Sequence, residues 1–127
     1  MGHGITVGFH LNPRVGDEAD FVALALGNLT AFRLQKERGE RLEWQVVRVE
    51  GEEPRHYRLV IRHPQRLLDF GFKSDLRRVL EELSQESQAD LTLELSQAKQ
   101  EGLRVVPLRH VKDEVDFWQD DFWNWIG

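Results

Sequence analysis

The sequence predicts a single α+β domain with a ferredoxin-like β-α-β-β-α-β plan. In this two-layer sandwich a four-stranded antiparallel sheet carries helices on one face, and an aromatic C-terminal helix follows. Three observations predict it. The 127 residues suit one domain, taken as 1–127. No stretch rich in Pro, Gly or Ser divides the chain. Segments with strand and helix periodicity follow one another in the order of this plan.

Residues 4–11 predict the first strand, because apolar and other residues alternate in GITVGFHL. The apolar side consists of Ile5, Val7, Phe9 and Leu11. Asn12 and Pro13 then supply a turn signal that ends the strand.

Residues 17–39 predict the first helix. Asp17 is suited to cap it, and Gly39 supplies the left-handed residue that ends it. Apolar residues recur at spacings of three and four and form one stripe, as on the core-facing side of an amphipathic helix. The stripe consists of Phe21, Leu24 or Ala25, Leu29 and Phe32.

Residues 41–50 and 55–63 predict two strands that pair as an antiparallel hairpin around the turn GEEP. On the second strand, Tyr57, Leu59 and Ile61 fall on one side, which we assign to the core. The next helix is predicted over 73–87, with Ser74 as its cap. Its inward positions are Leu76, Val79, Leu80 and Leu83.

Residues 89–101 fit two interpretations. LTLEL alternates like a strand, whereas the whole stretch contains good helix formers and is followed by Gly102. We favour the helix, with a break near Asp90. Residues 103–110 are then the last strand. Because proline cannot donate to a β ladder, Pro107 predicts that this strand lies at an edge or ends there.

Residues 112–127 combine acids with an unusual density of aromatic rings. The rings belong to Phe117, Trp118, Phe122, Trp123 and Trp125. One helical face of this segment is apolar enough to join the protein's own core. Rings also lie outside that face, which favours docking on a partner, and the neighbouring acids would steer the segment to a basic groove.

The outward side of the hairpin 42–62 is a second candidate surface, because it is rich in basic residues. Its proposed ligand-binding residues are His56, Arg58, Arg62 and His63. Nucleic acid or a small anionic ligand would suit such a face. The net charge of −5 and the core placement of the aromatic residues argue against nucleic acid. Val47, Val49 and Val60 on the same side also suggest dimerisation through the sheet.

No motif in the sequence requires catalysis. The chain has no Cys, no pair of His at metal-ligand spacing and no phosphate-binding glycine motif, so we assign no catalytic residues, metal or cofactor. No apolar run is long enough for a membrane span, and we expect a cytoplasmic location. The Arg-rich, Lys-poor composition suggests a bacterial source. The expected function is a non-catalytic protein-interaction module with a protein partner or a second copy of itself.

Overall fold

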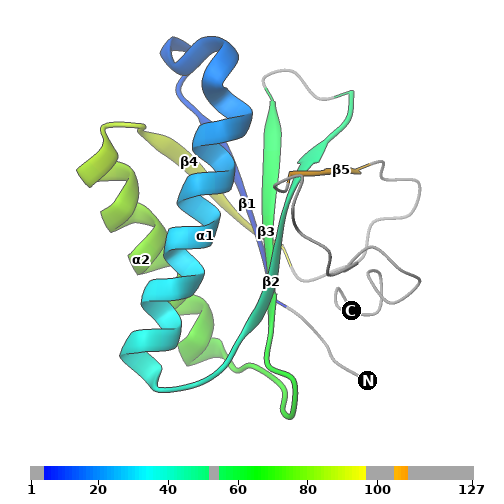
Figure 1. Cartoon of the computed structure of the whole chain (residues 1–127), viewed down its shortest axis with the longest axis vertical. Helices are drawn as coiled ribbons and strands as arrows, with labels where there is room; N and C mark the ends of the chain where they lie inside the picture. Colours follow the sequence, from blue (N-terminus) through cyan, green and yellow to red (C-terminus); the bar gives the residue numbers. More distant parts are fainter. Residues whose placement is uncertain (1–4, 52–54, 97–104, 109–127) are drawn as a thin grey trace.

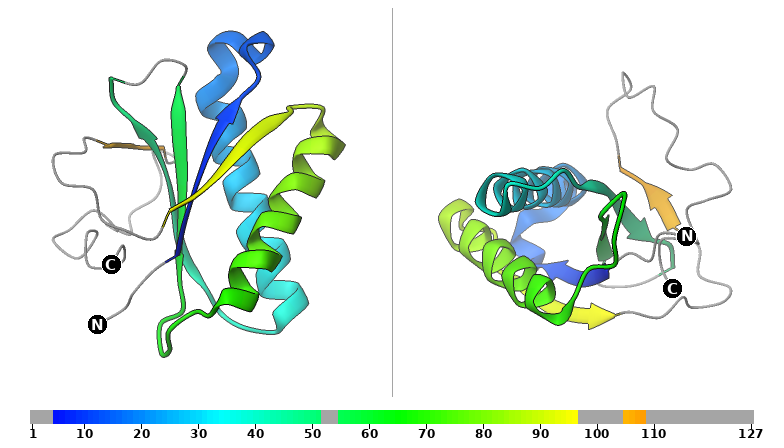
Figure 2. Two further views of the ribbon diagram at one scale, coloured as in Figure 1. Left: turned by 180° about the vertical axis from the view of Figure 1, so that it is seen from behind. Right: turned by 90° about the horizontal axis from the view of Figure 1, so that it is seen from below.

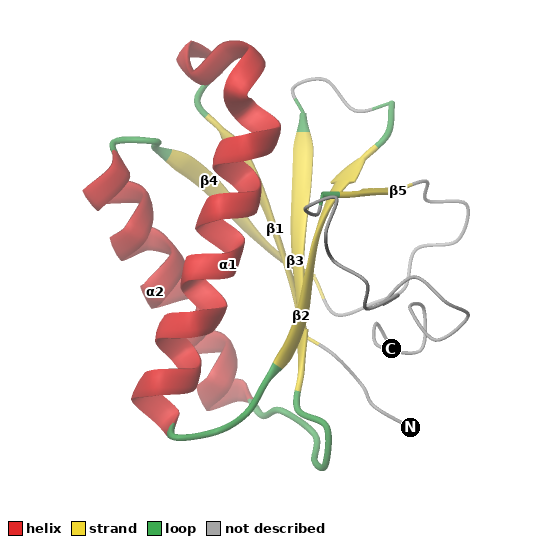
Figure 3. Ribbon diagram, in the orientation of Figure 1, coloured by secondary structure: helices red, strands yellow, loops and turns green. Residues whose placement is uncertain are grey.

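The computed structural model describes residues 5–51, 55–96 and 105–108, and the chain path is shown in Figure 1. The described residues form both strands and helices, which confirms the predicted α+β class (Figure 3). In chain order the elements are β1 (Ile5–Leu11), the 3-10 helix η1 (Pro13–Glu18), α1 (Ala19–Arg38), β2 (Glu43–Val49), β3 (His56–Arg62), α2 (Phe70–Ser87), β4 (Leu91–Ser96) and β5 (Val105–Pro107).

The five described strands form one sheet in the order β4-β1-β3-β2-β5, and every neighbouring pair is antiparallel. Strands β2 and β3 pair from Glu43↔Arg62 to Val49↔His56, which confirms the predicted hairpin. Strand β5 lies at the edge beside β2, as Pro107 predicted. Both helices lie on one side of the sheet, and β5 lies away from them (Figure 2).

The prediction of a helix over residues 89–101 is wrong for residues 91–96, which form strand β4. This strand pairs with β1 from Thr6↔Ser96 to Leu11↔Leu91. Gln88 and Asp90, with φ of 58° and 44°, turn the chain from α2 into the strand. Helix propensities differ by a few tenths of a kcal/mol per residue, so pairing with the edge of β1 outweighs them. The fourth strand is therefore β4, and residues 105–107 form a fifth strand.

The predicted stripe on the first helix does not face the core. Phe21, Leu29 and Phe32 are exposed to solvent, whereas the face toward the sheet consists mainly of smaller residues. The buried residues of α1 are Ala19, Ala23, Leu26, Gly27, Thr30, Ala31 and Leu34. A Cβ atom at Gly27 would lie 2.3 Å from Val46 Cγ2. The helix backbone therefore approaches the sheet so closely that large side chains do not fit between them.

Both helices begin at other residues than predicted. Helix α1 begins at Ala19 after η1, and Asp17 lies in η1 without capping α1. Its end is as predicted, with Gly39 in the left-handed region at φ 63°. Helix α2 is capped by Asp69, whose Oδ1 accepts a 2.9 Å hydrogen bond from the Phe72 backbone N–H, so Ser74 lies inside the helix. The inward positions predicted for α2 are all buried.

The core between helices and sheet is built from the apolar side of β1, β2 and β3 and the inner faces of α1 and α2. Phe9 and Tyr57 lie at its centre, with ring centroids 5.7 Å apart, and both are fully buried. Phe72 from α2 is also fully buried, and Leu34 from α1 packs into the same cluster. The register Phe9↔Tyr57 explains this centre, because it places the two rings side by side on neighbouring strands.

The second side of the sheet is buried as well. Its buried residues are Thr6, Gln45, Val47, Val49, His56, Arg58 and Val60. The sequence predicted an open, basic face here, and a sheet surface able to dimerise. The three valines of this side are 0–2% exposed, so they do not form the free apolar surface that such a dimer requires.

Candidate functional site

An apolar surface lies on the side of α1 that faces away from the sheet. We call Phe21, Ala25, Leu29 and Phe32 the α1 outer face. Phe21, Leu29 and Phe32 are 69%, 52% and 55% exposed. The residues lie at spacings of three and four, so they share one side of the helix. Because the small residues of α1 occupy the buried side, the large ones are left on the surface, where burial against another chain would be favourable.

Trp44 of β2 holds one side of the α1 outer face in place. Its ring meets that of Phe32 edge to face, with centroids 5.0 Å apart and planes at 79°. Its indole Nε1–H donates a 3.0 Å hydrogen bond to Asn28 Oδ1. An edge-to-face ring pair is a favourable arrangement, and the hydrogen bond fixes the indole relative to α1. The surface around Phe32 is therefore pre-organised by its attachment to the sheet.

Opposite charges flank the α1 outer face. Asp17 lies just before α1 and Lys36 in its last turn, and both are exposed. Within the described part of the chain, neither makes an ion pair. Other charges nearby are paired between the helices: Arg33 Nη2 lies 3.3 Å from Glu86 Oε2, and Arg78 Nη2 lies 2.7 Å from Glu37 Oε2. Asp17 and Lys36 are thus available to a second chain.

The five C-terminal rings predicted to bind a partner lie outside the described residues. They are Phe117, Trp118, Phe122, Trp123 and Trp125. Their role as a docking element stays a prediction, as does the helix or tail predicted over 112–127.

The hairpin residues predicted to bind an anion lie in different environments. His56 and Arg58 are buried, at 8% and 3% exposure. Arg62 Nε donates a 2.8 Å hydrogen bond to Glu43 Oε1, and His63 Nδ1 accepts one of 3.0 Å from the Gln65 backbone N–H. The structure therefore does not gather the four side chains on one open surface, and ligand binding by them remains a prediction.

The structure brings two of the histidines together. The rings of His10 and His56 lie with centroids 4.6 Å apart on the same side of the sheet, because the two residues are register partners on β1 and β3. His10 Nδ1 lies 3.1 Å from the Arg55 carbonyl oxygen. Among the described residues no group of three His, Asp or Glu is placed to hold a metal ion.

Sequence reasoning missed a polar cluster around Asp20. Tyr57 OH donates a 2.7 Å hydrogen bond to Asp20 Oδ1, Arg48 Nη1 donates to Asp20 Oδ2, and Arg55 Nη1 lies 3.6 Å from Asp20 Oδ1. Burial, and then the hydrogen bond to Asp20, raise the pKa of Tyr57 to about 12. The cluster joins α1 to the hairpin and leaves no reactive group in an open cavity, so we interpret it as structural. These residues are distant in sequence, so no local pattern marks the cluster.

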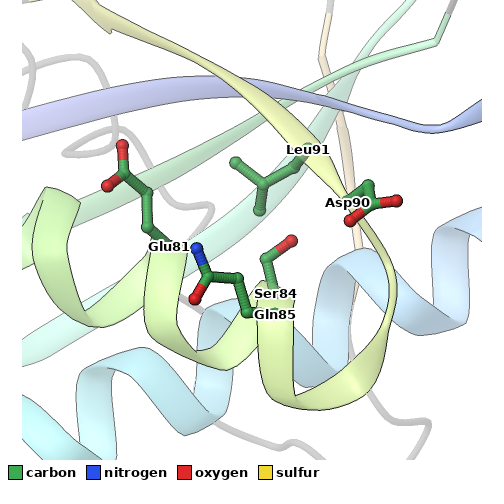
Figure 4. A pocket seen from close by; sticks show the side chains of 5 residues that line it. All are labelled: Glu81, Ser84, Gln85, Asp90 and Leu91. Atoms are coloured by element: carbon green, nitrogen blue, oxygen red, sulfur yellow. The ribbon is translucent and has the colours of Figure 1, made fainter.

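One pocket, of about 230 Å³, lies where α2 turns into β4 (Figure 4). Its lining residues are Glu81, Ser84, Gln85, Asp90 and Leu91. The two acids lie at opposite ends of the pocket in Figure 4. Asp90 Oδ2 accepts a 2.8 Å hydrogen bond from Arg14 Nη2, so this carboxylate already has a cationic partner. We therefore assign no catalytic role to this pocket.

Comparisons with protein-family models, with curated proteins and with solved structures found no match to this chain. No helix among the described residues is long and apolar enough to cross a membrane.

Proposed function

We propose that the protein is a non-catalytic protein-interaction module, an assembly factor, adaptor or regulator that works through contact with protein chains. The observation that carries this proposal is the α1 outer face, where three large apolar side chains are more than half exposed on one side of a helix. Contiguous apolar surface of this kind marks interaction sites. Aromatic side chains such as Phe21, Phe32 and Trp44 are suited to anchor a partner.

The acidic-aromatic segment 112–127 is the second contact element of this proposal. Its rings would supply the apolar contact, and its acids would favour a basic groove on the partner. Close packing between α1 and β2 at Gly27 is consistent with this role. A single Cβ atom at Gly27 would already lie 2.3 Å from Val46 Cγ2, so that core has no room for extra rings at this point.

We also propose a ferredoxin-like plan for the first four strands and the two helices. The strand order β4-β1-β3-β2, the antiparallel pairing of all neighbours and the placement of both helices on one side support it. Strand β5 extends this plan at the β2 edge. Because this plan serves many unrelated functions, it says nothing about the partner.

The proposal is tested by photocrosslinking from the α1 outer face. Phe32 is replaced by a benzophenone-bearing amino acid, and covalent adducts formed in the producing cells are identified by mass spectrometry. Adducts with a protein chain are expected from position 32. The matched control places the same probe at Phe70, which is 78% exposed but lies at the start of α2. No protein adduct from position 32, or equal labelling at both positions, would contradict the proposal.

The role of the C-terminal segment has its own test. Trp44→Phe removes the one tryptophan outside this segment, so the fluorescence of the variant reports Trp118, Trp123 and Trp125 alone. A docking element must be reachable in the isolated chain, so we expect acrylamide to quench this fluorescence nearly as strongly as it quenches free indole. Strong protection at low protein concentration would mean that the rings fill the protein's own interior, and the docking role would be lost.

A further inference from the structure

We infer that the partner of the α1 outer face is a second copy of this chain, with the two α1 helices packed antiparallel about a two-fold axis. This inference rests on the proposed function and deepens it by naming the partner. A two-fold interface brings the same surface of both copies together, so that surface must match itself when reversed. The spacing of residues along α1 meets this condition.

The apolar and polar residues of α1 are arranged symmetrically about the Leu26–Gly27 bond. Phe21 lies as far before this bond as Phe32 lies after it, and Ala25 is related in the same way to Asn28. In an antiparallel pair, each Phe21 therefore meets Phe32 of the other copy. The small Ala25 lies near the axis, where two helices approach to about 8–10 Å. Leu29 borders the same contact on the side toward α2.

The flanking charges select the antiparallel orientation. Asp17, in η1 just before α1, and Lys36 are equally distant in residue number from the Leu26–Gly27 bond, so in an antiparallel pair each Asp17 lies at the end of the contact where Lys36 of the other copy lies. A parallel pair would place Asp17 near Asp17 and Lys36 near Lys36, which is unfavourable. The macrodipoles of two helices also favour the antiparallel arrangement. Both charged residues are exposed, so no contact within the described chain competes with the pairing.

The side chains around the α1 outer face favour a defined surface for such a dimer. Phe32 is held by Trp44, and Trp44 by Asn28, so part of the contact is ordered before association. Arg33 and Glu37, which lie on the same helix, are already paired with α2 residues and do not place unpaired charge in the contact. The second side of the sheet, the other surface that the sequence suggested for dimerisation, is buried at Val47 and Val60.

The inference is tested by measuring the mass of the full chain across a range of concentrations by sedimentation velocity. We expect the wild-type mass to rise from 14.9 kDa toward twice that value as concentration increases. Phe21→Glu and Phe32→Glu should each weaken the dimer at least about tenfold, because each introduces a charge at an apolar anchor. Phe70→Glu, an exposed phenylalanine outside this surface, is the matched control and should not change dimerisation.

A charge exchange then tests the antiparallel orientation. Asp17→Lys alone and Lys36→Glu alone should each weaken the dimer several-fold at low salt, because each places like charges together. The double variant should restore most of the wild-type affinity, because opposite charges meet again. All variants should keep the wild-type circular dichroism spectrum, since the changed side chains are exposed.

The outcomes separate this inference from the proposed function. A wild-type chain that stays monomeric at every concentration, or a dimer unaffected by the phenylalanine substitutions, would overturn the homodimer. Failure of the double charge exchange to restore affinity would overturn the antiparallel arrangement. A crosslink from position 32 to a different protein would overturn the homodimer and still support an interaction module. A crosslink to a second copy supports both.

Discussion

The Tyr57 hydroxyl donates a 2.7 Å hydrogen bond to Asp20 Oδ1 and thereby joins the middle strand of the sheet to the first turn of α1. Arg48, on the neighbouring strand β2, donates to the other oxygen of the same carboxylate. Asp20 therefore connects three elements that are distant in sequence. The phenol ring is buried in the core, and its hydroxyl reaches this carboxylate, which is only partly buried.

Tyr57→Phe is expected to lower the free energy of unfolding by about 1.5–3 kcal/mol, the usual range for a hydrogen bond to a charged group. The ring would still fill its place, so the fold should be retained. Urea denaturation at pH 7 measures the change. The paired variant Asp20→Asn should cost more, because it leaves the cations Arg48 and Arg55 without their carboxylate. Equal stability of wild type and Tyr57→Phe would contradict the prediction.

The same residue predicts a loss of stability in alkali. The pKa of Tyr57 is raised to about 12 by burial and by Asp20, compared with about 10 for an unfolded tyrosine. Between these values the unfolded chain releases its phenolic proton while the folded chain retains it. The free energy of unfolding therefore falls as pH rises from about 10 to about 12, by an amount on the order of 2 kcal/mol. The free energies of unfolding of wild type and Tyr57→Phe, measured at each pH, should therefore converge over this range. A constant difference between them would show that Tyr57 does not titrate as described.

Glu40 predicts a loss of stability in acid. The hydrogen bond from Arg66 is the largest cause that lowers the pKa of Glu40 below its ordinary value of 4.5. Burial opposes it, and a hydrogen bond from Arg38 lowers the pKa further. The contribution of this carboxylate to stability is complete above its pKa in the unfolded chain. It disappears as pH falls through its pKa in the folded protein. Glu40→Gln should therefore destabilise the protein at pH 7 and lose less stability than wild type below pH 4.5. Thermal denaturation from pH 7 to pH 3 measures this, with the exposed Glu50→Gln as control.

Gly27→Ala is expected to destabilise the protein by about 1–3 kcal/mol, although alanine is the better helix former. The new Cβ atom would lie 2.3 Å from Val46 Cγ2, so the Val46 side chain, α1 or β2 must shift. Val46→Ala removes that methyl group and costs stability by leaving a cavity. The double variant should lose less stability than the sum of the two single variants, because the new methyl group fills the vacated space. If the two losses of unfolding free energy simply add in the double variant, as measured by urea denaturation, this contact is ruled out.

An engineered disulfide tests the register of β4. His10 and Thr92 are partners on β1 and β4, and the chain has no cysteine of its own. Partners in an antiparallel pair have Cα atoms about 4.5–5.5 Å apart, within the range that a disulfide spans. We expect His10→Cys/Thr92→Cys to form an intramolecular disulfide, visible as faster migration on a non-reducing gel. His10→Cys/Gln85→Cys is the control, since α2 lies on the other side of the sheet. A helix over residues 89–101 would not give this pattern.

The first helix shows why an apolar stripe can be assigned to the wrong side. Phe21, Leu29 and Phe32 have the spacing of a core-facing stripe, but small residues fill the face that packs on the sheet. Periodicity indicates which residues share a side of a helix, not which side is buried. The distance between α1 and β2 decides that, and it is fixed by Gly27 and Val46, which are far apart in sequence.

The sequence by itself determined the α+β class, the extent of β1, the β2–β3 hairpin, the inward face of α2 and the end of α1 at Gly39. These features depend on alternation, helical spacing and backbone preference, which act between near neighbours. The tertiary structure alone decided that residues 91–96 form a strand, that the second side of the sheet is buried and that the large residues of α1 lie on its surface. Each of these depends on parts of the chain that are distant in sequence. The strand at 91–96 depends on the edge of β1, the burial of the second side depends on what packs on β2 and β3, and the exposed residues of α1 depend on the short distance between α1 and Val46. Local patterns cannot fix them, because the free energy of each arrangement comes from contacts that exist only after the chain has folded.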